Sequence, residues 1–271
     1  MKTINTFITE KLKINKPKPT VEHTLFPKTK DELVQMIKTE IRTNGVNCNL
    51  NHIDTSKIED MSFLFLDSDF NGDISEWDVS NVRNMKGLFR KSIFNGDISE
   101  WDVSNVENMK NMFYDSDFKG DISDWDVSKV KNTYQMFVGS DFNGDISRWN
   151  VSNIENMSYM FFDSYFNGDI SKWDVSNVKY MKGLFNNSNF NGDISEWYVS
   201  NVEDMHTMFA YSKFNRDISK WNVSNVIDMH QMFDNSEFNQ DISKWKINLN
   251  CDTKYMFHNC SIKEEYKPKL L

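Results

Sequence analysis

The eight tryptophans of this chain constrain its fold more than any other feature, because each lies 24 residues from the next. They are Trp77, Trp101, Trp125, Trp149, Trp173, Trp197, Trp221 and Trp245. Other columns keep the same spacing, from Phe70, Asp73, Ile74 and Ser75 to Phe238, Asp241, Ile242 and Ser243. A fixed period of this length indicates one structural unit copied along the chain, each copy burying its apolar face against its neighbours.

The repeat pattern also predicts the limits of the array. A degenerate first copy begins at Val46, with Ile53 in place of tryptophan, and the last copy drifts after Trp245. All four prolines lie outside this span, as expected where a proline would remove a hydrogen bond between coils. We predict an N-terminal amphipathic segment and Pro-containing linker at 1–28, a capping helix at 29–45, a repeat solenoid at 46–261 and a C-terminal tail at 262–271.

Each copy combines two apolar spacings. The apolar residues of segment 98–103 are spaced as in the strand of a leucine-rich repeat. Ser104 and Glu107 then form a capping-box pair, and the apolar residues of segment 106–113 follow at helical spacing. We therefore expect an α/β repeat solenoid, leucine-rich-repeat-like, with about nine coils of one short parallel strand and one short helix each, capped by an N-terminal helix.

The N-terminal region carries two further patterns. Thr29 and Glu32 form a capping box, which predicts a helix over 30–43 that covers the first coil. Ile4, Phe7, Ile8 and Leu12 share one helical face, and the lysines around them make segment 3–14 basic. Two interpretations stay open for that segment: it anchors a partner as a helix in a groove, or it folds back on the first coil.

Charge and composition argue against several classes of protein. The net charge of −9 disfavours a general nucleic-acid binder, because phosphate recognition requires a basic surface. No apolar run approaches the roughly 20 residues that span a bilayer, and the first residues lack the apolar core of a secretion signal. Cys48, Cys251 and Cys260 have no metal-ligand spacing and are expected to be free thiols. An intracellular or virus-associated protein fits these features.

The aspartate column from Asp73 to Asp241 allows two interpretations. In one, each carboxylate accepts a hydrogen bond from the backbone two residues on, in an Asx turn. In the other, the column binds calcium, as glycine–aspartate repeats of some parallel β-helices do. Each loop offers few oxygens, whereas calcium takes six to eight. We expect no cofactor and favour the turn.

Exposed columns that vary between copies are the candidate binding residues, because the buried columns report folding alone. Two such columns flank the tryptophans on the predicted strand face, which solenoids commonly use for binding. The first three copies hold six acids in these columns, and the last two hold three lysines. The alternative is that these columns only keep the surface soluble and that their charges vary at random between copies. The candidate residues are Glu76, Asp78, Glu100, Asp102, Asp124, Asp126, Arg148, Lys172, Tyr198, Lys220, Lys244 and Lys246.

Two smaller groups are also candidates. Aromatic residues scattered on the predicted helix side favour an interface, although some of them have no specific role there: Tyr114, Tyr134, Tyr159, Phe162, Tyr165 and Tyr180. His206 and His230 occupy one column, which fits either a zinc pair or, as we expect, a solvated helix face. No nucleophile, base and acid converge in the sequence, so we predict that the protein is not an enzyme.

The repeat, quoted from Phe94 to Phe113 as FNGDISEWDVSNVENMKNMF, resembles the BspA-like leucine-rich-repeat surface proteins over residues 46–261. That resemblance implies a leucine-rich-repeat-like fold and a role in adhesion or protein binding at cell surfaces. We therefore predict a non-enzymatic scaffold that binds a host or cell-surface protein through the strand face. The alternative is a structural protein that self-associates end to end, for example a virion or assembly component.

Overall fold

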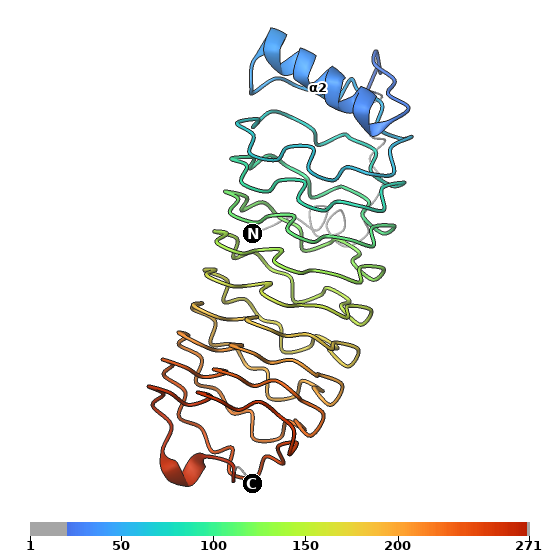
Figure 1. Ribbon diagram of the computed structural model, residues 1–271. Helices are drawn as coiled ribbons and strands as arrows, with labels where there is room; N and C mark the ends of the chain where they lie inside the picture. Colours follow the sequence, from blue (N-terminus) through green and yellow to red (C-terminus); the bar gives the residue numbers. More distant parts are fainter. Residues whose placement is uncertain (1–20, 270–271) are drawn as a thin grey trace, which may run out of the picture.

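The computed structural model describes residues 21–269 and shows a stack of 24-residue coils (Figure 1). Parallel bridges join equivalent residues of neighbouring coils, in one unbroken column of nine residues from Asp60 to Asp252. Helix α2, Lys30–Asn44, lies across the first coil, and a short 3₁₀ helix, η1, Glu264–Tyr266, follows the last one. Within the described residues, no helix is long and apolar enough to cross a membrane.

The predicted α/β solenoid is wrong. Within residues 46–261 the structure has no helix, and the contacts between coils are isolated bridges rather than strands. The segment predicted to be helical in each coil is a series of turns, and it carries most of the hydrogen bonds between coils. The predicted strand segment 98–103 contains no strand.

The backbone hydrogen bonds explain why no helix forms. In residues 85–92, alternate amides donate to carbonyls of the next coil: Met85, Gly87, Phe89 and Lys91. The amides between them close tight turns onto carbonyls three residues back: Leu88, Arg90 and Ser92. An α-helix would instead send every amide to the carbonyl four residues back. The turns require a positive φ twice per coil, 60° at Gly87 and 56° at Lys91 in this one.

The predicted helix caps serve other purposes. The Ser104 amide donates to the Asp102 carboxylate at 3.1 Å, so this serine belongs to an Asx turn. Glu107 does not return to Ser104, because its carboxylate pairs with Arg83 and Lys131 of the two neighbouring coils. The spacing of the apolar residues is common to a helix and to this series of turns, which is why it misled the prediction.

The tryptophan column is buried as predicted. The eight indoles are 2–5% exposed, and Trp77 and Trp101 stack with ring centroids 6.4 Å apart and planes 4° apart. Each indole Nε1 donates to a backbone carbonyl of the preceding coil, as Trp101 does to Ile74 at 3.1 Å. Two columns of stacked phenylalanines lie beside the tryptophans, and columns of buried isoleucine, valine, methionine and leucine complete the core, so it contains a continuous aromatic spine.

Both ends of this spine are covered. Leu33 and Ile37 of α2 are buried against the first coil, and the Thr29 hydroxyl accepts from the Glu32 amide at the start of the helix. At the other end Ile262 is buried, and the Ile242 amide donates to the Tyr266 carbonyl. The predicted apolar face at Ile4, Phe7, Ile8 and Leu12 lies outside the described residues.

Candidate functional site

The predicted binding residues flank the tryptophans on a surface that we call the outer face, the columns beginning at Glu76 and Asp78. Glu76 is half-buried, and the other eleven residues are exposed. Some charges are already paired between coils, as Arg148 donates to the Asp124 carboxylate at 2.8 Å. Asp78 and its aspartate and asparagine equivalents accept from the serine amide two residues on. The second column therefore also has a structural role.

The aspartate column from Asp73 to Asp241 forms Asx turns. In all eight coils the carboxylate accepts from the serine amide two residues on, at 2.8–3.0 Å. The amide and hydroxyl of Ser147 lower the pKa of Asp145 in this way. Within residues 21–269, no three His, Cys, Asp or Glu side chains are grouped so that they could hold a metal. The turn interpretation is confirmed, and the calcium interpretation gains no support.

His206 and His230 stack with ring centroids 5.1 Å apart, but they do not lie on a helix. Each Nδ1 lies 3.5 Å from a carboxylate of the next coil, Asp228 and Asp252 respectively. Burial raises the pKa of the neighbouring Asp204 carboxyl, and the charge of Asp228 adds to this effect. The histidines are thus paired with acids rather than grouped as a zinc site.

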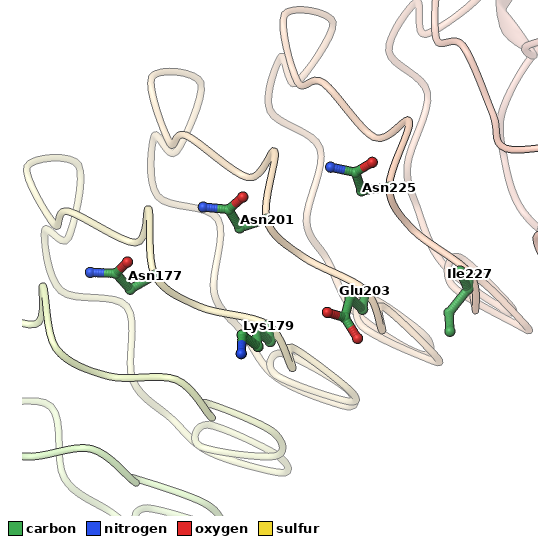
Figure 2. A pocket seen from close by; sticks show the side chains of 6 residues that line it. All are labelled: Asn177, Lys179, Asn201, Glu203, Asn225 and Ile227. Atoms are coloured by element: carbon green, nitrogen blue, oxygen red, sulfur yellow. The ribbon is translucent and has the colours of Figure 1, made fainter.

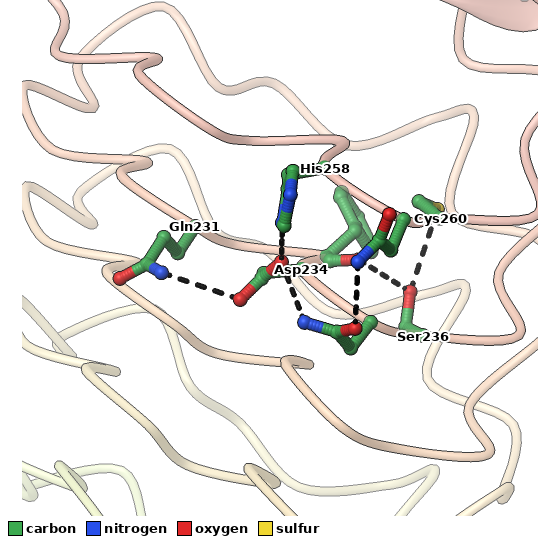
Figure 3. A network of polar contacts seen from close by, with 8 residues as sticks. Gln231, Asp234, Ser236, His258 and Cys260 are labelled. Carbon is green, nitrogen blue, oxygen red and sulfur yellow. Dashed lines mark hydrogen bonds and ion pairs between the residues drawn. The ribbon is translucent and has the colours of Figure 1, made fainter.

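A buried carboxylate joins the last two coils, and sequence reasoning missed it. Asp234 is 2% exposed, and its carboxylate lies 2.7 Å from His258 Nδ1. It also accepts from the side-chain amides of Gln231 at 3.2 Å and Asn235 at 2.8 Å (Figure 3). The signal in the sequence was an acid followed 24 residues later by a histidine, because Asp234 and His258 occupy the same column. This network has donors enough to hold the carboxylate, and its role is structural.

A continuous groove runs along the stack beside two other columns. Three hollows of about 290, 320 and 390 Å³ share lining residues, so together they form one groove across six coils. Figure 2 shows its two rows over three coils: one of asparagines, the other of alternating side chains ending at Ile227. The lining residues are Glu107, Lys129, Lys131, Asn153, Glu155, Asn177, Lys179, Asn201, Glu203, Asn225 and Ile227.

The asparagine row of the groove is held in one orientation. The side-chain amides of Asn153, Asn177, Asn201 and Asn225 each donate at 2.7 Å to the carbonyl of a serine in the preceding coil. This bond fixes the side chain and leaves its oxygen as an acceptor at the groove. A row of pre-oriented polar groups loses little entropy when a partner binds.

The second row alternates in charge from coil to coil: Arg83, Glu107, Lys131, Glu155, Lys179 and Glu203. Glu107 is held between Lys131 at 3.0 Å and Arg83 at 3.5 Å, and the hydrogen bond from Lys131 is the main cause of its lowered pKa. In the part of the chain that the structure describes, Glu155, Lys179 and Glu203 make no ion pair. The 24-residue spacing could have revealed this row, but Glu107 was assigned to a helix cap.

Five of the six predicted aromatic residues lie on what we call the inner face, the columns beginning at Asn84, Lys86 and Arg90 together with the column of Tyr159 beside them. Arg90 lies over the Tyr114 ring at 4.8 Å, and Lys110 lies over Tyr134 at 4.5 Å. Tyr159 meets Tyr134 and Phe162 edge to face, each at 5.9 Å. Tyr180 is exposed in the Asn84 column of this face, and Tyr165 is exposed outside it.

Comparison with known proteins identifies a repeat family. A family model described as "Mycoplasma protein of unknown function, DUF285" matches residues 32–141, 116–213 and 181–267. The three overlapping matches agree with a repeated unit. Neither the curated proteins nor the solved structures contain a match to this chain.

Proposed function

Because this chain belongs to the DUF285 family, a repeat family of unknown function, we propose its role from its own surface: it is a non-enzymatic scaffold that binds a protein partner in the groove. The observation that carries the proposal is the continuity of the groove over six coils with side chains held in place. Repeat proteins bind partners along extended surfaces that cross several repeats, and the groove is such a surface. The resemblance to BspA-like surface proteins supports an adhesive role.

The chemistry of the groove suits an extended polar partner. Glu155, Lys179 and Glu203 offer charges that no ion pair within residues 21–269 occupies, so a partner with the opposite alternation would pair with them. Ile227 ends the row and is 53% exposed, and Leu249 beyond it is 76% exposed. An apolar anchor next to alternating charges gives both affinity and register.

The alternative of end-to-end self-association is disfavoured by the covered ends. Stacking one array on another would need both terminal core faces to be free. Helix α2 covers the first coil, and the segment around Ile262 covers the last. Displacing either segment would expose buried apolar side chains to water, which opposes such contacts.

The experiment is a capture of binding proteins from the native host with matched charge variants. The doubly reversed groove variant Lys179→Glu/Glu203→Lys keeps the net charge, and Lys172→Glu changes the outer face alone. We expect a partner retained by the wild type and by Lys172→Glu to be lost from the groove variant, because its charges then meet like charges. Equal retention of the partner by all three proteins would refute binding in the groove. Loss of the partner from Lys172→Glu alone would favour binding at the outer face, which the sequence predicted.

A further inference from the structure

The outer and inner faces lie on opposite walls of the core. Glu100 and Asp102 of the outer face flank Trp101, whereas Arg90 of the inner face follows Phe89. The Trp101 and Phe89 rings pack against each other with centroids 6.2 Å apart. The core is therefore about two rings thick here, with one face on each side of it.

The stack curves towards the inner face. Stacked phenylalanines on the inner wall, such as Phe89 and Phe113, have ring centroids 5.6–5.8 Å apart. Stacked tryptophans on the outer wall are 6.4–6.5 Å apart. Coils that lie closer together on one side make that side concave, so the outer face of one molecule matches the inner face of another in shape.

Charge runs in opposite directions along these two faces. The outer face begins with six acids, Glu76, Asp78, Glu100, Asp102, Asp124 and Asp126, and ends with Lys220, Lys244 and Lys246. The inner face begins with Lys86, Arg90 and Lys110 and ends with Asp204, Asp228 and Asp252. Asp60, Lys182 and Lys254 depart from this order, and Lys182 lies one coil before Asp204 and acts on its carboxyl. His206 and His230 lie beside the terminal acids, and Asp234 and His258 of the Arg90 column pair with each other.

We propose that copies of this chain nest side by side, with the outer face of one seated in the inner face of the next and the two chains parallel. In this orientation acids meet cations at both ends, whereas the antiparallel orientation would bring acids onto acids. The two faces differ, so the contact does not close on itself and produces an open-ended row. The groove lies between the two faces along each coil, so nesting leaves it open to a partner.

The association is expected to depend on salt and concentration. The pairs are exposed, so each is weak and is screened by ions. We expect the full-length chain to form larger species over a roughly hundredfold rise in concentration at about 0.05 M salt, and to dissociate at about 0.5 M salt. Sedimentation velocity measures both. A monomer under all these conditions would overturn the proposal.

Two charge-reversed variants make the test specific. Glu76→Lys/Glu100→Lys alters the outer face without touching the Asx turns of its second column, and Lys86→Glu/Lys110→Glu alters the inner face. Each alone should weaken association at least about tenfold, since like charges then face each other. Mixed together they should associate again, because the lysines of one meet the glutamates of the other.

The controls separate nesting from loss of fold. Circular dichroism should show the wild-type spectrum and melting for both variants, and the recovery on mixing itself requires folded chains. The groove variant Lys179→Glu/Glu203→Lys should associate like the wild type. If the mixture stays dissociated, or if only one of the two faces affects association, copies do not nest in this way.

Discussion

Replacing Gly183 with alanine should destabilise the stack by about 2–5 kcal/mol. An ideal Cβ on Gly183 would lie 2.4 Å from ring carbons of Tyr159 in the preceding coil. That ring is fixed by edge-to-face contacts with Tyr134 and Phe162, so it cannot move without losing them. Overpacking of this kind costs about 1–3 kcal/mol, and alanine at the φ of +56° found here costs about 1–2 kcal/mol more.

Gly139 provides a matched control. It has a φ of +61°, but an ideal Cβ there would lie 3.5 Å from its nearest neighbour, a side-chain oxygen of Asp115. Gly139→Ala should therefore cost only the backbone contribution, about 1–2 kcal/mol. In a Tyr159→Ala background the ring is absent, and Gly183→Ala should then cost as little as Gly139→Ala.

Urea unfolding monitored by tryptophan fluorescence measures these differences, with the free energy of unfolding obtained from the midpoint and slope. The core of each regular coil contains an indole, so the probe reports on the whole array. Equal losses for Gly183→Ala and Gly139→Ala would refute the steric argument. So would a full loss for Gly183→Ala when Tyr159 has already been replaced.

Three further changes test the turns and the terminal network. Thr207 is a β-branched residue at a φ of +51°, which strains the backbone, and asparagine tolerates this conformation better. Thr207→Asn should therefore raise the free energy of unfolding by up to about 1 kcal/mol in the same urea assay, and a lower free energy of unfolding would contradict the strain. His258→Ala leaves the buried Asp234 carboxylate without its 2.7 Å partner and should cost about 1–3 kcal/mol, with no cost if Asp234 is already replaced by asparagine. The lowered pKa of Asp145 in the folded chain means that its stabilisation is present above the unfolded pKa and is lost as pH falls through the folded one. Urea midpoints between neutral and acid pH should therefore fall less steeply for Asp145→Asn than for the wild type, and equal slopes would exclude this linkage.

The candidate site shows where sequence reasoning stops. The twelve outer-face residues were predicted as exposed columns, and they are exposed or half-buried, but half of that surface also forms turns. The groove was not predicted. Its asparagines and alternating charges repeat at the same spacing as the tryptophans, yet only the path of the backbone shows that two such columns border one hollow.

The sequence by itself determined the register of this protein. The columns that begin at Trp77, Phe70 and Asp73 each repeat every 24 residues, and this holds only if equivalent residues of neighbouring coils lie in contact. The stacked indoles, the Asx turns and the extent of the array therefore follow from the spacing. Tertiary structure alone decided the backbone conformation within each coil. Apolar residues three and four apart fit a helix or a series of turns equally well. The turns are formed because alternate amides, such as those of Met85 and Phe89, bond to the next coil, and that partner is invisible to any local pattern.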